Sequence, residues 1–470
     1  MKLTVENIGR IHRSEIRLDG LTVVAGPNNG GKSTLGEALF ALANSQFDFP
    51  KKVVERNEIE IRRAIQECLW VHTPDFRNER EQRFSMDFRS IDFLSSEMAS
   101  YFLSANDVVS ENEVRSWLKS FPDIARGKIN EKKRVHQPRK LGSLNTIVNI
   151  LCASDEQAKQ FRLTCVKLFN DKETTLRRYF ARNYFESLFS GQYESVKCPE
   201  DESTMVSLKT DGSNPRGITI DFANGACKNV SVNLASQEYV LFIDDPNLLD
   251  RVTSSRWHGD AAFGIVRSGV KSEQFAQALR RKMLDKTRVW TADDRETYEA
   301  KCEKIINVLE TAHKGNISST DEGGVVLEEF GSDEQILLQN VSVGVKAIEL
   351  LKELLKSGAL DENTFLVLDE PEIHLHPEWQ IIYAHALVMI ADLLHTKVLV
   401  TTHSPYFIQA IDVYTTIQEN TDMVHTYTPH EYSQSAVDFV EVSGEQKQQI
   451  LDKMAEPFDA LQQLLLEYNL

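Results

Sequence analysis

The alternation of apolar and polar residues predicts a strand-rich start to the chain. Short runs at Lys2–Ile8, Arg13–Leu18 and Leu21–Ala25 are typical of strands, because turns that contain glycine separate them. The third run is wholly apolar, as expected of a buried strand. Helical spacing of apolar residues follows over Thr34–Ala43. A buried strand therefore leads through a tight connection into a helix.

The pattern of apolar and polar residues changes twice in the middle of the chain. From about residue 51 to 200 the apolar residues recur at helical spacing. Around 204–245, short β-rich runs alternate with Asp-Gly and Asn-Gly turns, which predicts an antiparallel meander whose last strand is Tyr239–Ile243. The runs Val325–Phe330 and Gln335–Gln339 predict a further hairpin.

The last third predicts parallel strands. The segment Thr364–Glu372 is predicted to be an apolar strand that ends in two carboxylates. Pro377–Leu394 follows as a helix, and a second apolar strand begins at Lys397. Strand, helix and strand in this order imply parallel pairing through a right-handed crossover. The expected fold class is therefore α/β.

The connection after Leu21–Ala25 carries the most informative motif. It reads GPNNGGKST and fits the P-loop pattern, whose backbone N–H groups surround a polyphosphate. We expect Lys32 to reach the β- and γ-phosphates and the Ser33 hydroxyl to bind Mg²⁺. The alternative is a glycine-rich turn without a ligand. The predicted nucleotide-binding residues of this loop are Gly26, Pro27, Asn28, Asn29, Gly30, Gly31, Lys32, Ser33 and Thr34.

Three further residues at predicted strand ends suggest hydrolysis. Asp369 would hold Mg²⁺ alongside Ser33, and Glu370 would orient the attacking water. His403 ends the next strand, so parallel pairing would direct it toward the γ-phosphate. The alternatives are a helix N-cap followed by a first-turn acid for the Asp-Glu pair, and a core histidine for His403.

A third candidate segment precedes the predicted strand that begins at Thr364. Ser342 opens a predicted helix and could present its hydroxyl and the helix N-terminus to a phosphate, with Lys346 nearby. Ser342 could equally be an ordinary N-cap. Since nothing local brings this segment onto the chain's own P-loop, we expect it to contact nucleotide held by a second subunit.

Composition limits the cellular location and the partners that we expect for this chain. The 470 residues carry a net charge of −17, which argues against a surface generally suited to nucleic acid. The sequence has neither a run of about 18 apolar residues nor a basic-then-apolar leader, and its six cysteines form no C-x-x-C pair. These features favour a cytoplasmic protein without a membrane span. One basic run, Arg126–Lys140, could contact DNA phosphates or be a solvated loop.

The ordered motifs resemble the ABC-type ATPases of the SMC, RecF, RecN and overcoming-lysogenization-defect (OLD) group. GPNNGGKS resembles their Walker A motif, Phe365–Glu370 their Walker B, His374–Pro377 their D-loop region and Thr401–Pro405 their H-switch. Val341–Val345 occupies the signature position, where only Ser342 and Gly344 match the family's Leu-Ser-Gly-Gly pattern. The resemblance implies an Mg²⁺-dependent ATPase that binds ATP between two subunits of a homodimer or larger homo-oligomer.

The resemblance also implies a divided ATPase domain. Residues 1–45 would form its N-terminal half, 46–324 a mostly helical insertion that includes the β-rich stretch, and 325–470 its C-terminal half. Only 65 residues follow the H-switch, too few for the nuclease domain of OLD proteins. The arrangement is similar to stand-alone ATPases of prokaryotic antiphage systems such as Septu and PARIS, which act on a separately encoded effector.

Three functions are compatible with these observations. The first is an ATPase switch that senses a trigger and controls a separate nuclease or toxin. The second is a RecF- or SMC-like ATPase in DNA repair or recombination. The third is a scaffold that binds ATP and hydrolyses it negligibly.

Overall fold

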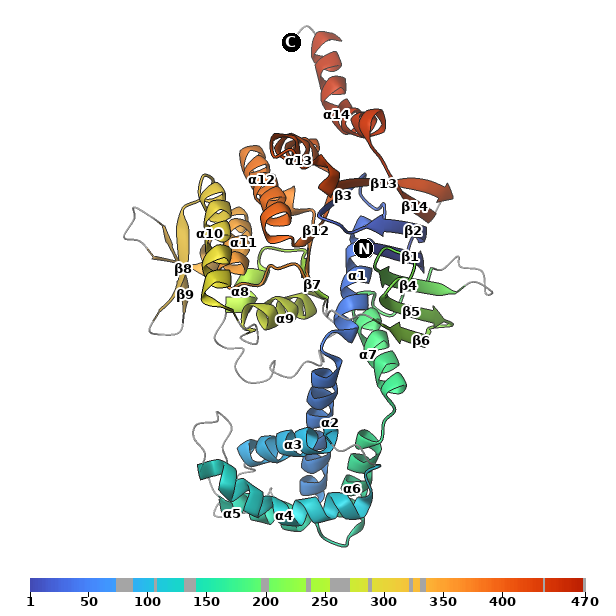
Figure 1. Ribbon diagram of the computed structural model, residues 1–470, viewed down its shortest axis with the longest axis vertical. Helices are drawn as coiled ribbons and strands as arrows, with labels where there is room; N and C mark the ends of the chain where they lie inside the picture. Colours follow the sequence, from blue (N-terminus) through green and yellow to red (C-terminus); the bar gives the residue numbers. More distant parts are fainter. Residues whose placement is uncertain are drawn as a thin grey trace. The chain divides into compact units, whose positions relative to one another are not determined.

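The computed structural model divides into two compact units, each with its own core (Figure 1). It describes residues 1–72, 88–104, 108–130, 141–195, 203–233, 238–253, 271–285, 290–320, 324–329, 335–433 and 436–467. Among these residues, no helix is both long enough and apolar enough to cross a membrane.

The larger unit is built on a mixed sheet of eleven strands in the order β6-β5-β4-β1-β2-β14-β13-β3-β12-β11-β7. A second sheet has the order β10-β9-β8. The strands are β1 (Lys2–Ile8), β2 (Ile11–Arg17), β3 (Leu21–Ala25), β4 (Thr204–Lys209), β5 (Gly217–Ala223), β6 (Ala226–Val232), β7 (Tyr239–Ile243), β8 (Gly315–Ser319), β9 (Val325–Glu329), β10 (Gln335–Leu337), β11 (Thr364–Asp369), β12 (Lys397–Thr402), β13 (Val424–Ser433) and β14 (Ala436–Glu441).

Helices cover both faces of the large sheet. Adjacent residues of a strand point to opposite faces. Val367 of β11 faces Gly36 of helix α1, whereas Leu368 lines a cavity with Leu350 of α11 and Tyr383 of α12. The helices of this unit are α1 (Lys32–Gln46), α7 (Glu173–Leu188), α8 (Leu248–Thr253), α9 (Lys271–Met283), α10 (Ala292–Leu309), α11 (Val343–Lys356), α12 (Pro377–Leu394), α13 (Pro405–Ile417) and α14 (Gly444–Glu467), with short 3-10 helices η2 (Leu338–Asn340), η3 (Pro371–His374) and η4 (Thr421–Met423). The part of α7 that belongs to this unit begins at Arg177.

The smaller unit, Asp48–Leu176, is helical. Its core contains Ile61, Leu94, Leu118, Ile147 and Phe161, one from each of its helices, and all five are buried. The helices are α2 (Phe49–His72), α3 (Phe88–Leu103), α4 (Glu111–Asn130), α5 (Leu141–Leu151) and α6 (Glu156–Phe169).

The parallel pairing predicted for the last third is confirmed, since β11 and β12 pair in parallel register. The pattern also predicted the hairpin of β9 and β10 correctly. The predicted meander holds for β4, β5 and β6 but was wrong for β7, which pairs in parallel with β11. All five residues of β7 are buried and apolar, the signature of a strand covered on both faces rather than of an alternating meander strand.

The predicted insertion, 46–324, is therefore too long. β4 pairs with β1 and β7 with β11, so both belong to the large sheet. The separate helical unit ends at Leu176. The β-rich stretch near 204–245 was assigned to the insertion because its partner strands, β1 and β11, are distant in the sequence. A local sequence pattern does not reveal such pairing.

We expect Gly36→Ala to destabilise the larger unit by about 1–3 kcal/mol, because overpacking a filled core forces side chains to shift. An added Cβ would lie 2.7 Å from both Phe242 Cε2 and Val367 Cγ1, which are buried. Denaturant unfolding measures the effect. In the control Gly127→Ala, the new Cβ meets nothing within 4 Å on an exposed helix, so stability should rise by up to about 1 kcal/mol. Equal effects of the two substitutions would contradict this packing.

Candidate ATPase site

The P-loop lies between the end of β3 and the start of α1. Gly31 and Asn29 both have left-handed backbone, with φ of 78° and 64°. Asparagine tolerates this conformation better than most residues, which explains its place where a glycine is usual. Gly26 has no room for a side chain, because a Cβ there would lie 2.5 Å from Pro429 Cδ on β13. The loop is thus held in shape by its own sequence and by the neighbouring strand.

Lys32 is folded into this loop. Its ammonium group donates to the carbonyls of Gly26, at 3.0 Å, and Pro27, at 2.9 Å, and the side chain is only 4% exposed. It also lies 3.4 Å from Glu370 Oε1. The lysine charge therefore lies inside the loop that the P-loop pattern assigns to phosphate binding.

Parallel register brings the predicted metal ligands together. Asp369 ends β11 beside Thr401 of β12, and β12 pairs in parallel with β3, which leads into the loop. Ser33 Oγ donates to Asp369 Oδ1 at 3.0 Å, and the Thr401 hydroxyl donates to the same oxygen. A hydroxyl and a carboxylate this close can share one Mg²⁺, which prefers oxygen ligands. The donor set therefore fits the ion.

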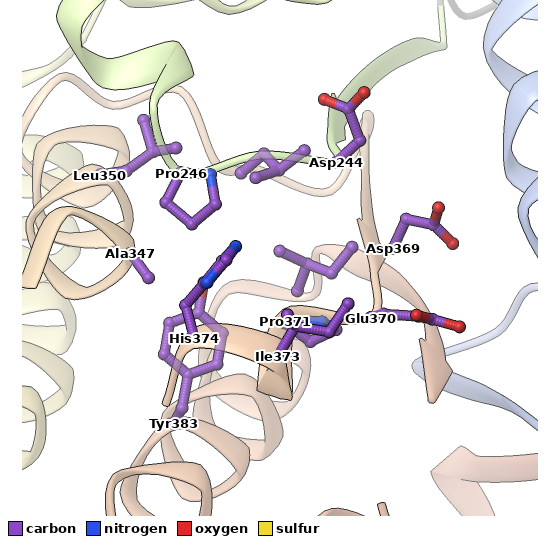
Figure 2. Close-up of a pocket in the computed structure, with 12 residues that line it drawn as sticks. Asp244, Pro246, Ala347, Leu350, Asp369, Glu370, Pro371, Ile373, His374 and Tyr383 are labelled. Atoms are coloured by element: carbon purple, nitrogen blue, oxygen red, sulfur yellow. The ribbon is translucent and has the colours of Figure 1, made fainter. Parts of the chain in front are cut away.

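Glu370 has strained backbone. Its φ of 48° and ψ of 52° lie in the left-handed region, which is uncommon for residues other than glycine and asparagine. Its N–H donates to the carbonyl and the hydroxyl of Thr401, at 3.0 and 3.1 Å, which holds the turn. Figure 2 shows the carboxylates of Asp369 and Glu370 extending to the same side, away from Ala347 and Leu350 of α11. Strain of this kind is often found at functional sites.

His403 follows β12 and lies next to Glu370. Its Nδ1 is 3.6 Å from Glu370 Oε1, and the side chain is 43% exposed. It is therefore not a core histidine. The structure brings Lys32, Ser33, Asp369, Glu370 and His403 together at one edge of the sheet.

Further carboxylates crowd the same edge. Asp244 follows β7, and Glu37 lies one turn beyond Ser33 on α1. Burial raises the pKa of Glu37, and the nearby charges of Asp369 and Asp244 raise it further, whereas an ion pair with Lys271 at 2.7 Å lowers it. Loss of solvent likewise raises the pKa of Asp244. The edge carries excess negative charge, which a cation would relieve.

The three candidate residues of the signature segment differ in exposure, since Ser342 is exposed whereas Gly344 and Lys346 are buried. Ser342 is the exposed N-cap residue of α11, and among the described residues its hydroxyl makes no capping hydrogen bond. Gly344 packs against the D-loop region, where a Cβ would lie 2.7 Å from the carbonyl oxygen of His374. Ser342 is therefore accessible to a second subunit, while Gly344 serves packing within the chain.

Lys346 does not fit the predicted contact with phosphate. Its side chain is 3% exposed, and its ammonium group binds Asp250 Oδ2 at 2.8 Å and Asn247 Oδ1 at 3.1 Å. A buried lysine with a carboxylate partner is stabilised in place, because breaking the pair would leave an uncompensated charge. The prediction of Lys346 as a nucleotide ligand is corrected accordingly.

Two groups that organise the site were missed by sequence reasoning. Thr401 bonds both Asp369 and the backbone of Glu370. Glu372 accepts hydrogen bonds from the hydroxyl of Thr402 and the N–H of His403. Both residues stand beside recognised motifs, but only the pairing of β11 with β12 shows what they contact. The predicted basic run is a different case, since most of Arg126–Lys140 lies outside the described residues.

One comparison with known proteins agrees with a nucleotide-hydrolysing class. Residues 267–408 match the family model of an AAA ATPase domain. A search of curated proteins finds no match. Solved structures with similarity include the SMC head domain from Thermotoga maritima, with 11% identity and a TM-score of 0.35 over 94% of this chain and 98% of that one. The Smc head domain from Pyrococcus furiosus, solved with the C-terminal domain of ScpA, has 10% identity and a TM-score of 0.33. The similarity covers 96% of this chain and 98% of that one.

The class follows from the loop, the sheet and the family match, which covers β11, β12 and the residues from Ser342 to His403. Together they support a P-loop ATPase with a mixed α/β fold.

Buried charges also anchor α11, the helix behind Ser342. Glu349 and Lys352 are fully buried and 2.9 Å apart, and the lysine donates to the carbonyl of Gly315 at 2.6 Å. His313 Nδ1 lies 3.1 Å from Glu349 Oε1, and Glu329 is 3.5 Å from its Nε2. These carboxylates raise the pKa of His313, because they favour the protonated ring.

Protonated His313 should stabilise the folded chain. Its stabilisation is complete below the ordinary histidine pKa of about 6.5 and is lost as the pH rises through the raised value in the folded state. We therefore expect the difference in unfolding free energy between the parent and His313→Gln to shrink as the pH is raised from 6 to 9. Denaturant unfolding at each pH measures it. A difference independent of pH would show that the charge on His313 contributes nothing.

Proposed function

We propose that this chain binds ATP with Mg²⁺ and hydrolyses it at the edge formed by β3, β12 and β11. The observation that carries the proposal is that Ser33 donates to Asp369 while Lys32 pairs with the neighbouring Glu370 at the same edge. Lys32 would neutralise phosphate charge, and Ser33 with Asp369 would hold the ion. Mg²⁺ would supply charge neutralisation of the β- and γ-phosphates.

Glu370 is the proposed general base. Its carboxylate lies beside the Lys32 ammonium and His403 Nδ1, and its strained turn fixes the direction of the side chain. A carboxylate held at this point can orient a water molecule toward the γ-phosphate, while His403 contacts the phosphate itself.

The proposed site takes its last contact from a second copy of the chain. The exposed hydroxyl of Ser342 stands at the N-terminus of α11, where backbone N–H groups favour an anion. A shared nucleotide would make association depend on ATP. The chain would then act as a switch that closes when ATP binds and opens after hydrolysis.

We further propose that the switch is the sensor or regulatory subunit of a prokaryotic antiphage system, with a separately encoded nuclease or toxin as effector. Support comes from the motif order and from the helical unit Asp48–Leu176, which has its own core and holds none of the proposed site residues. That unit is a candidate for recognition of the trigger or effector. Stimulation of ATP hydrolysis by DNA, without any effector protein, would instead favour a RecF- or SMC-like role.

Glu370→Gln should retain ATP binding and lower the rate of hydrolysis by at least about 100-fold, because it removes the base and keeps the size of the side chain. Lys32→Ala should weaken ATP binding, because phosphate charge is no longer neutralised. Phosphate release and binding of a fluorescent ATP analogue measure the two effects. Hydrolysis by Glu370→Gln at the parental rate would refute the assignment.

A mixing experiment tests the shared nucleotide. Lys32→Ala damages the P-loop of a subunit, and Ser342→Arg blocks its contact in trans, so each variant alone should be inactive. In a mixed dimer, one site combines an intact P-loop with an intact Ser342. An equal mixture should therefore regain hydrolysis, because the two defects fall on one site and leave the other whole. A mixture as inactive as its components would contradict sharing.

A further inference from the structure

Glu372 is a buried acid beside the proposed site. It lies on η3, two residues after Glu370, and its side chain is only 3% exposed. Its Oε1 accepts hydrogen bonds from Thr402 Oγ1 at 2.6 Å and from His403 N at 2.8 Å. One carboxylate oxygen on the segment after β11 therefore fixes the segment that follows β12.

The other oxygen of Glu372 is equally buried. Among the described residues, Oε2 has no hydrogen-bond partner. A buried carboxylate is costly unless its charge and lone pairs are compensated, and an apolar side chain would be the more stable occupant of such a position. Glu372 is thus poorly explained by folding stability alone, and an unsatisfied buried polar atom calls for another reason.

The imidazole ring of His403 supplies that reason. Its Nδ1 is 3.5 Å from Glu372 Oε1 and 3.6 Å from Glu370 Oε1, so the ring stands between two carboxylates. The same Glu372 oxygen also holds the His403 backbone N–H. Glu372 therefore holds the backbone of His403 and lies close to its ring, while Glu370 lies close to the ring and to Lys32.

We propose that Glu372 is a positioning residue for ATP hydrolysis and acts through His403. It attracts the proton on Nδ1, which leaves Nε2 as the ring atom directed to the nucleotide. It also competes with Glu370 for the N–H at Nδ1, so that Glu370 is less strongly held by His403 and can orient water. This inference rests on the proposed function, because His403 matters only if the chain hydrolyses ATP.

Kinetics of single and double variants test the proposal. Glu372→Gln retains an oxygen acceptor for Thr402 and His403 N but removes the charge, and Glu372→Ala removes both. Each should lower kcat by about tenfold or more and leave the affinity for a fluorescent ATP analogue within about twofold, because Glu372 acts through His403 on the hydrolysis step rather than on nucleotide binding. In a His403→Ala background, the same substitutions should have no further effect on kcat.

The matched control is Glu362→Gln. Glu362 is exposed and precedes the start of β11, whereas Glu372 follows the end of this strand, so the control variant should hydrolyse ATP like the parent. A structural defect alone would lower kcat by the same factor with or without His403, and that result would overturn the proposal. So would a parental kcat for both Glu372 variants. If Glu372→Ala does not fold, Glu372→Gln decides by the same two criteria. A parent that binds but does not hydrolyse ATP would remove the proposed function itself, which is a different failure.

Discussion

The parallel pairing of β3, β12, β11 and β7 is the constraint on which the site depends. Each of these strands is a nearly continuous apolar run, buried on both faces, and the carboxyl ends of parallel strands meet at one edge of the sheet. The P-loop, Asp369 and His403 all follow such ends. A displacement of β11 by one residue would turn Asp369 to the opposite face and separate it from Ser33.

A second set of interactions ties the signature helix to this edge. Three buried charged residues of α11 are paired. Lys346 binds Asp250, and Glu349 and Lys352 pair with each other and with groups near β8. A small cavity of about 30 Å³ lies between α11 and the end of β11, lined by Ala347, Leu350 and Leu368. The helix is thus packed against the strand that carries Asp369, and Ser342 at its N-terminus has a defined position relative to the site.

Much of this arrangement could be predicted from the sequence, because its signals are local. A P-loop between a buried strand and a helix, and an acid pair at the end of an apolar run, need no knowledge of distant contacts. The roles of Thr401 and Glu372 could not be predicted, since they arise from hydrogen bonds between neighbouring strands. Lys346 was assigned wrongly for the same reason: a lysine in the first turn of a helix resembles a phosphate ligand until Asp250, 96 residues away, is seen to pair with it. The placement of β7 failed because its partner β11 follows it by more than a hundred residues.

The proposed hydrolysis requires that this edge of the sheet binds phosphate through a metal ion. Phosphate release from ATP by the unaltered chain, followed as Mg²⁺ is titrated from full chelation to millimolar concentration, tests it most directly. Since the proposed oxygen ligands bind nucleotide phosphate through the ion, release should be absent under chelation and should rise to saturation with Mg²⁺. Release that is unchanged by chelation, or absent at every Mg²⁺ concentration, would contradict the account.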